Sequence, residues 1–393
     1  MKNVLAAFDK FKGSLTAQEA CEVAHKAILA FEPTANVVAA PLTDGGEGFS
    51  KILTDAASGK HIEVRTLDAR FAEKPAHFGI VDLNQLPTDA RETLHLPESA
   101  RKIAVVEMAQ ASDLVSLPDE LRNPWEASSI GTGLLLREAA NLDVDAILLG
   151  IGGSATNDIG LGALEALGAE FFDAEGMPLL RLTPKDFDRL DQIDLSNNLL
   201  PMPTIRIACD VENPLLGEQG ATKVFAPQKG LPSNEHEAME AALEKASGLL
   251  CEASEKERDS LNLAGAGAAG GIGLGLHLVY GAEFLPGFDL VSQWLNLAHL
   301  IERVDLILTG EGSFDQSSLL GKGPWSLIQA GAKAGKRTHV YAGSVAQNIE
   351  AHLPQTAIAK GITPENTSLE LAFAKAPEFL YQSILNTLQD LAD

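Results

Sequence analysis

Cysteine is scarce in this chain, and the few cysteines lie far apart. Its 393 residues include only Cys21, Cys209 and Cys251, and no two of them form a CxxC pair. Both a zinc site and a disulfide framework are therefore unexpected. Cysteine usage of this kind fits a reducing compartment, so we expect a cytoplasmic protein.

Positive charge is also in short supply. The sequence has 30 lysines and arginines against 54 aspartates and glutamates, which gives a formal net charge of −24. No local basic patch stands out, and this argues against a nucleic-acid partner. An anionic substrate would have to be attracted by a few local lysines or by a metal ion.

Long apolar runs are missing as well. No stretch of 18 apolar residues occurs, so we expect no membrane span. The apolar start is too short and too soon acidic for a signal peptide, and residues 4–8 predict a buried strand instead. With 45% hydrophobic and 21% charged residues, the composition is that of a soluble globular protein.

Several well-known catalytic signatures are absent. The sequence has no Walker motif (GxxxxGKS or GxxxxGKT), no HRD or DFG motif of protein kinases, and no HExxH or GxSxG motif of hydrolases. A GxGxxG pattern does occur at residues 265–270, but residues 252–260 before it are charged and helical in character. A dinucleotide site needs a buried strand at that place, which argues against a nicotinamide or flavin, and these glycines either let a helix pack closely against a sheet or let the backbone approach a ligand.

Three apolar runs each end in a loop rich in glycine and carboxylates. The loops are residues 43–48 (TDGGEG), 150–158 (GIGGSATND) and 309–315 (TGEGSFD). Proteins of the α/β class place ligands outside the carboxyl ends of their strands. Glycine lets backbone N–H groups approach an anion, and the acids can hold a metal ion or take a proton. Together these loops suggest a phosphate and its magnesium.

The hydrophobic pattern predicts two α/β domains. Near both chain ends, buried strands alternate with helices, which favours a parallel sheet. Between residues 61 and 110, period-2 alternation favours antiparallel or mixed strands. We therefore expect a Rossmann-like parallel-sheet domain from residues 1–60 and 285–393, with residues 61–284 inserted as an α/β domain with a mixed sheet. The main expected strands are residues 4–8, 37–40, 61–65, 76–81, 103–107, 146–149, 205–208, 305–308 and 338–342, and the main helices are residues 17–30, 49–57, 133–140, 160–167, 235–254, 290–301, 325–334 and 369–391.

Outside the three loops, a few polar residues at strand ends are candidates for the site. Lys10, Lys12 and Ser14 follow the first strand and precede a helix, so they form either an anion cradle or a solvated turn. Lys322, in GKGP, is either a phosphate lysine or a turn lysine, and Asp210 with Asn213 either reaches the site or caps a helix.

Taken together, these loops resemble the bacterial class I glycerate kinases. The matching segments run in order over nearly the whole chain, from residue 9 to about residue 345, and Lys10 stands where the family often has serine. They are DKFKGSL (residues 9–15), DGGEG (44–48), GTG (131–133), GIGGSATND (150–158), ACDVENPL (208–215), GATKVFAPQKG (220–230), GAGAAGG (265–271), TGEGSFD (309–315) and GKGP (321–324).

The resemblance implies a kinase that phosphorylates D-glycerate with ATP and Mg²⁺, with the 2-hydroxyl as the favoured acceptor. It also implies two α/β domains with the active site in the cleft between them. The partners would be small molecules, and a homodimer is left open. The alternatives are a nicotinamide-dependent oxidoreductase acting on a small hydroxy acid and a non-catalytic regulator that binds a sugar acid.

With this reaction in view, the candidate residues take roles. We expect Asp210 to be the general base, Asp44 the second choice, and Lys12 a catalytic cation. Glu311 and Asp315 are the expected magnesium ligands. The expected substrate- and nucleotide-binding residues are Lys10, Ser14, Gly45, Gly46, Glu47, Gly152, Gly153, Ser154, Asn157, Asn213, Gly267, Gly310, Gly312 and Lys322.

Overall fold

The computed structural model describes residues 2–320 and 323–391. The chain divides into two compact units, one made of residues 1–43 and 291–393 and the other of residues 44–290. Both units are of the α/β class, which confirms the expected fold class of a parallel sheet from both chain ends plus a mixed sheet. In the described part of the chain, no helix is both long enough and apolar enough to cross a membrane.

The unit built from the two chain ends is a parallel sheet with helices on both faces. The strand order is β13-β12-β11-β1-β2, and every neighbouring pair is parallel. The strands are β1 (Asn3–Phe8), β2 (Asn36–Ala39), β11 (Leu306–Phe314), β12 (Arg337–Val345) and β13 (Ala357–Gly361). The helices are α1 (Ala17–Phe31), α10 (Leu297–Arg303), α11 (Gln316–Leu320), α12 (Pro324–Lys333), α13 (Leu369–Ala374) and α14 (Ala376–Asp390), and α9 (Gly287–Trp294) crosses from the other unit.

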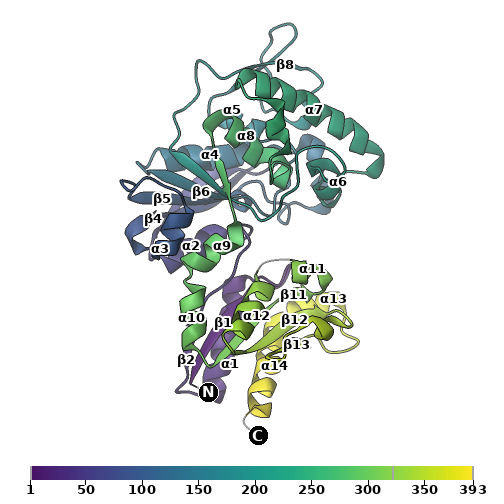
Figure 1. Ribbon diagram of the computed structural model, residues 1–393. Coiled ribbons are helices and arrows are strands. Elements are labelled where there is room, and N and C mark those ends of the chain that lie inside the picture. Colours follow the sequence, from purple (N-terminus) through teal and green to yellow (C-terminus); the bar gives the residue numbers. More distant parts are fainter. Residues whose placement is uncertain (1, 321–322, 392–393) are drawn as a thin grey trace. The chain divides into compact units, whose positions relative to one another are not determined.

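The core of this unit follows from the alternation of buried side chains along its strands. Tyr341 of β12 packs with residues of α1 and α14 on one face of the sheet. These two helices lie side by side (Figure 1). The neighbours of Tyr341, Val340 and Ala342, pack on the other face with Ile328 of α12. Since successive strand residues point to opposite faces, a strand buried on both sides needs apolar residues at every position.

The second unit has a six-stranded mixed sheet in the order β10-β9-β6-β5-β4-β3 and a two-stranded ribbon of β7 and β8. The β3–β4 and β4–β5 pairs are antiparallel, and the others in the larger sheet are parallel. The strands are β3 (Lys60–Leu67), β4 (Glu73–Asp82), β5 (Lys102–Glu107), β6 (Ala146–Gly150), β7 (Glu170–Asp173), β8 (Leu190–Asp194), β9 (Thr204–Ala208) and β10 (Glu283–Leu285). The helices are α2 (Phe49–Ala56), α3 (Thr88–Thr93), α4 (Ile130–Ala140), α5 (Leu161–Ala166), α6 (Ala221–Phe225), α7 (His236–Ala253) and α8 (Ile272–Tyr280).

Helix α2 belongs with this second unit, although the βαβα pattern of the first 60 residues assigned it to the other. It packs against β4 and β5, and the Ser50 Oγ donates a hydrogen bond of 2.8 Å to the Val105 carbonyl. The unit boundaries accordingly fall at residues 43/44 and 290/291, where we had expected 60/61 and 284/285. The loop that carries Asp44 is therefore part of the second unit, with the loop of residues 150–158.

Two further elements differ from the expected pattern. β11 does not end at Leu308 but continues through the glycines to Phe314, because Gly310 pairs with Phe8 on one side and Tyr341 on the other. The helix expected over residues 290–301 is two helices, α9 and α10, and Asn296 between them has a left-handed backbone with φ 53°. Strands β7, β8, β10 and β13 gave no clear signal in the sequence.

Candidate functional site

The first group of candidate residues lies at the carboxyl ends of β1 and β11. The strand order reverses between these two strands, since β2 follows on one side of β1 and the later strands lie on the other. Such a reversal leaves a crevice at the carboxyl ends of the strands, where ligands of open α/β sheets bind. The Asp9 N–H donates to the Gly310 carbonyl at 2.9 Å, so the loop after β1 starts beside the glycines of β11.

The loop after β1 is a tight turn that presents Lys12. The Phe11 N–H donates to the Leu15 carbonyl at 2.8 Å, and the Ser14 Oγ donates to the Phe11 carbonyl at 3.0 Å. A Cβ on Gly312 would lie 3.1 Å from the backbone nitrogen of Lys12, so β11 passes close to the turn. Ser14 thus holds the turn itself, while Lys12 is exposed and its backbone lies close to Gly312.

The two expected metal ligands lie on or just after β11. Asp315 accepts hydrogen bonds from the Ser317 Oγ at 2.5 Å and the Ser317 N–H at 2.8 Å, and these bonds hold the pKa of its carboxyl below the usual value. Asp315 therefore caps the first turn of α11 in ionised form. Among the described residues, no three His, Cys, Asp or Glu side chains come together as a metal site. Two carboxylates still fit Mg²⁺, which is commonly held by one or two carboxylates plus water and phosphate oxygens. Lys322 lies outside the described residues.

The second group of candidates lies at the carboxyl ends of β6 and β9, in the other unit. The Gly152 N–H donates to the Gly45 carbonyl at 3.0 Å, and a Cβ on Gly152 would lie 2.6 Å from the Gly46 Cα. The Asp44 Oδ1 accepts from the Gly46 N–H at 3.1 Å, and Asp44 and Glu47 are exposed. Two glycine loops that were far apart in the sequence are therefore in backbone contact, and only glycine fits at residue 152.

Asp210 and Asn213 extend this second group. A Cβ on Gly45 would lie 3.2 Å from the Ala208 carbonyl, so the end of β9 reaches the same glycine loops. The Asp210 Oδ2 accepts from the Phe288 N–H at 2.8 Å, which places the carboxylate at the start of α9. The Asn213 Nδ2 donates to the Gln219 carbonyl at 2.8 Å, which ties the loop after β9 together.

The GxGxxG segment packs against these loops and does not follow a strand. The Gly267 N–H donates to the Asn213 carbonyl at 2.9 Å, and a Cβ there would lie 2.1 Å from the Pro214 carbonyl oxygen. A Cβ on Gly270 would lie 2.2 Å from the Thr156 carbonyl oxygen. A short 3-10 helix, Arg258–Asn262, precedes the segment. The glycines therefore serve close backbone packing, which is one of the two roles expected for them.

Comparisons with known proteins agree over the full length of the chain. The model of the glycerate kinase family matches residues 4–392. The chain belongs to the glycerate kinase family. Glycerate kinase of Halalkalibacterium halodurans is 35% identical over 389 residues, covering 98% of this chain and 97% of the relative. Glycerate 2-kinase of Escherichia coli K12 is 35% identical over 353 residues, covering 89% and 87%.

Structure comparison gives the same family. A crystal structure of a candidate glycerate kinase 2 from Salmonella typhimurium LT2 matches with a TM-score of 0.76 and 33% identity, covering 100% of this chain and 98% of that one. This chain is therefore an enzyme of the glycerate kinase family, and its resemblance to the class I members is confirmed. The oxidoreductase and regulator alternatives find no support in these relatives.

Three buried charged residues near the second group were missed among the candidates. Asp158, fully buried, accepts from the Ser129 N–H and Oγ, both at 2.7 Å, and burial raises the pKa of its carboxyl. Lys229, which belongs to the segment GATKVFAPQKG, donates hydrogen bonds to the Ser154 Oγ and the Thr156 carbonyl. Glu107, at the end of β5, accepts from backbone N–H groups at the start of α2. Lys229 lies within residues 220–230, one of the segments that resemble the family, so the resemblance could have identified it as a candidate.

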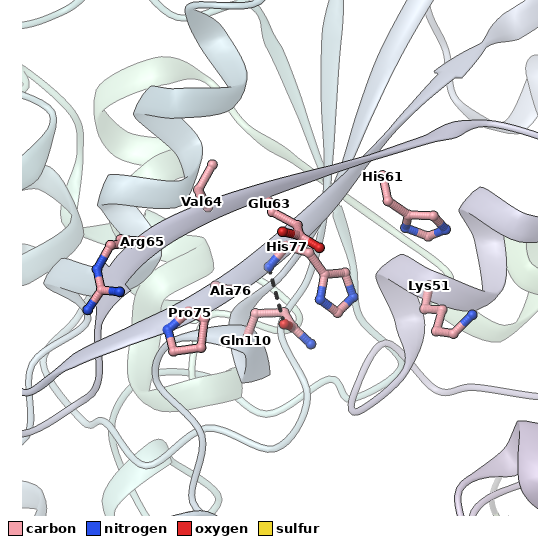
Figure 2. A pocket seen from close by; sticks show the side chains of 9 residues that line it. All are labelled: Lys51, His61, Glu63, Val64, Arg65, Pro75, Ala76, His77 and Gln110. Atoms are coloured by element: carbon pink, nitrogen blue, oxygen red, sulfur yellow. Dashed lines mark hydrogen bonds between the residues drawn. The ribbon is translucent and has the colours of Figure 1, made fainter.

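A separate groove of about 890 Å³ lies over β3, β4 and α2. Figure 2 shows His77 and Gln110 near its middle, with His61 and Lys51 on one side and Arg65 on the other. Three of its basic side chains already have acidic partners: Asp55 binds Lys51 at 2.5 Å and His61 at 2.6 Å, and Glu73 binds Arg65 at 3.1 Å. These pairs offset the positive charge, so the groove is a poor site for a phosphate group.

Proposed function

We propose that this enzyme transfers the γ-phosphoryl group of ATP to the 2-hydroxyl of D-glycerate, forming 2-phospho-D-glycerate. The observation that carries the proposal is the match of the whole chain to glycerate kinases, one of which is named glycerate 2-kinase. The cysteine usage of the sequence supports a cytoplasmic reaction.

We assign the nucleotide phosphates to the residues at the carboxyl ends of β1 and β11. Lys12 supplies a positive charge for the phosphate oxygens, and Gly310 and Gly312 allow backbone atoms to come near them. Glu311 and Asp315 would hold Mg²⁺, which neutralises charge on the transferring phosphoryl group when bound. Asp315 is suited to this because its carboxyl is held ionised.

We assign the glycerate to the loops at the carboxyl ends of β6 and β9. Asp210 takes the proton from the 2-hydroxyl of glycerate while the oxygen of that hydroxyl attacks the γ-phosphorus of ATP. The bond between the γ-phosphorus and the bridging oxygen breaks, and that oxygen leaves with ADP. The Asp210 Oδ2 accepts from the Phe288 N–H, which fixes the orientation of the carboxylate. Asp44 is the second choice of base. The N–H groups of Gly152 and Ala155 already donate to the carbonyls of Gly45 and Ser112, so the other backbone N–H groups of residues 152–157 are the expected donors to the substrate or the phosphate.

A coupled assay with ATP, Mg²⁺ and D-glycerate, with ADP monitored, tests the proposal. ADP release that depends on D-glycerate is the expected result, and ³¹P NMR of the product should show 2-phosphoglycerate. Absence of ADP above background would refute the kinase reaction, and 3-phosphoglycerate would refute only the position. A change in nicotinamide absorbance with glycerate would favour the oxidoreductase alternative, and glycerate binding without turnover would favour the regulator.

The base assignment has its own test. Asp210→Asn should lower kcat by at least about 100-fold, because the amide cannot take the proton. The fold should survive, since the asparagine Oδ1 can still accept from the Phe288 N–H. The measurements are kcat and the circular dichroism spectrum, with Asp44→Asn compared in parallel. An Asp210→Asn enzyme with nearly unchanged kcat would show that Asp210 is not the base.

A further inference from the structure

Lys229 is a lysine buried inside the second unit. Only 2% of its surface is exposed, and its Nζ donates to the Ser154 Oγ at 3.0 Å and to the Thr156 carbonyl at 2.6 Å. Burial lowers the pKa of the ammonium group to about 7, and the charge of Asp158 acts in the opposite direction. A lysine in such a place needs a reason, because burying its charge costs free energy. Both of its hydrogen bonds go to one segment, residues 154–158, in a loop that sequence alone had marked as a site.

The same segment is held from its other end. The Asp158 carboxylate accepts from the Ser129 N–H and Oγ, the Gly160 N–H and the Gly162 N–H at 2.7 to 3.3 Å. The Lys229 side chain therefore fixes residues 154 and 156, and the hydrogen bonds to the Asp158 carboxyl fix residue 158. Asn157 stands between these two anchored points.

Two buried polar side chains of the segment have no hydrogen-bond partner among the described residues: the Thr156 hydroxyl and the Asn157 amide, which is unpaired at both its oxygen and its nitrogen. Asn157 is fully buried, and within residues 2–320 and 323–391 neither its Oδ1 nor its Nδ2 has a hydrogen-bond partner. A buried polar group without a partner is costly, and native proteins rarely keep one without a ligand, an ion or a water molecule to satisfy it. An amide offers a donor and an acceptor side by side. A small hydroxy acid matches it, with carboxylate oxygens to accept and a hydroxyl to donate.

We infer that Lys229 is a positioning residue for the phosphoryl-transfer reaction, fixing Asn157 so that its amide contacts the hydroxy-acid substrate. The inference rests on the proposed function. Lys229 donates to the carbonyl of Thr156, which belongs to the peptide bond between Thr156 and Asn157. Without the lysine, this peptide bond is no longer held, and the Asn157 side chain loses its fixed orientation. Asn157 is then the contact residue, and Lys229 acts through it.

A double-mutant cycle tests this relation. Lys229→Met, Asn157→Ala and the double variant are compared with the wild-type enzyme by kcat, by KM for D-glycerate and for ATP, and by melting temperature. We expect each single variant to raise KM for D-glycerate at least 10-fold, with KM for ATP changed less than twofold. The double variant should be no worse than Asn157→Ala alone, because the two residues act on one contact.

The matched control is Lys223→Met. Lys223 lies on α6, is about one-third exposed and pairs with Glu218 at the surface. Its replacement should leave both KM values unchanged. If Lys229→Met does not fold, Lys229→Gln takes its place in the cycle, since its shorter side chain withdraws the donor from the Thr156 carbonyl but keeps a polar group at the buried site.

The outcomes separate the two proposals. If the wild-type enzyme releases no ADP with D-glycerate, the proposed function fails. If the wild-type enzyme is active but the two substitutions multiply in their effect on KM for D-glycerate, Lys229 does not act through Asn157. If Lys229→Met lowers only the melting temperature, or changes KM for ATP equally, the lysine is structural and the inference is overturned.

Discussion

Replacing Glu107 by glutamine should remove a large part of the pH dependence of stability between pH 5 and pH 8. The Glu107 carboxyl is fully buried at the end of β5, and it accepts from the Gly48 N–H at 3.1 Å and the Ser50 N–H at 3.0 Å. These bonds pair two backbone N–H groups at the start of α2 that have no partner within the helix. The N-cap residue Gly48 has no side chain that could accept them. Burial raises the pKa of Glu107 from 4.5 to about 7, although these hydrogen bonds lower it.

The sign follows from proton binding. Below pH 4.5, Glu107 is protonated in both the folded and the unfolded protein, so the full contribution to stability is present. Between pH 4.5 and about 7 only the folded state keeps the proton, and stability falls as the pH rises. From pH 5 to pH 8, the loss from this one group is about 2.5 kcal/mol, since one pKa unit corresponds to about 1.4 kcal/mol.

Urea unfolding of the wild-type enzyme and Glu107→Gln at pH 5, 6, 7 and 8 measures this effect. The free energy of unfolding of the wild-type enzyme, relative to that of Glu107→Gln, should fall by about 2.5 kcal/mol from pH 5 to pH 8. Glu63→Gln, at an exposed position on β3, is the control and should keep the wild-type pH dependence. ¹³C NMR of the Glu107 carboxyl should show a midpoint near pH 7. A midpoint near pH 4.5, or parallel curves for the two proteins, would refute the reasoning.

Two further substitutions test local structure by activity and melting temperature. Gly152→Ala should lower both, by roughly 1–3 kcal/mol in stability, because its Cβ would lie 2.6 Å from the Gly46 Cα; Gly361→Ala, with nothing within 4 Å, is its control. If Gly152→Ala behaves like Gly361→Ala, the backbone contact between the two glycine loops does not constrain residue 152. Thr16→Ala should cost about 1 kcal/mol and leave kcat unchanged, because it removes the capping box with Glu19 at the start of α1. Unchanged stability in that variant would mean that the cap is replaced by solvent.

Local signals in the sequence were sufficient for most of the regular elements. The helix expected at residues 17–30 is α1, Ala17–Phe31, and Thr16 caps its start. A cap and its helix lie within a few residues of each other, so the signal is local. The strand expected at residues 205–208 is β9, Thr204–Ala208, for the same reason. Such elements carry their whole signal in adjacent residues.

Elements that depend on distant partners were harder to predict. The glycines of residues 310 and 312 read as a loop, yet they are part of β11, since the neighbours that make them a strand are β1 and β12. Helix α2 read as part of the first domain, because nothing in its own residues shows that it packs against β5. The loops of residues 43–48 and 150–158 follow the strands β2 and β6, as the sequence predicted. The buried residues Lys229 and Glu107 gave no signal of burial in their own segments.

The pairing of β1 with β11 also sets an order for synthesis and folding. Lys2 and Asp305 are 303 residues apart in the sequence, and they are joined by a hydrogen bond of 2.8 Å at the start of these two strands. At normal rates of translation, β1 leaves the ribosome roughly 15–60 s before its central partner exists. Residues 44–290 form a continuous unit that can fold during that interval. Until β11 is made, β1 can pair only with β2, and the other edge of β1 has unpaired backbone N–H and C=O groups. The nascent chain is therefore most exposed to aggregation at its own N-terminus, until β11 has emerged.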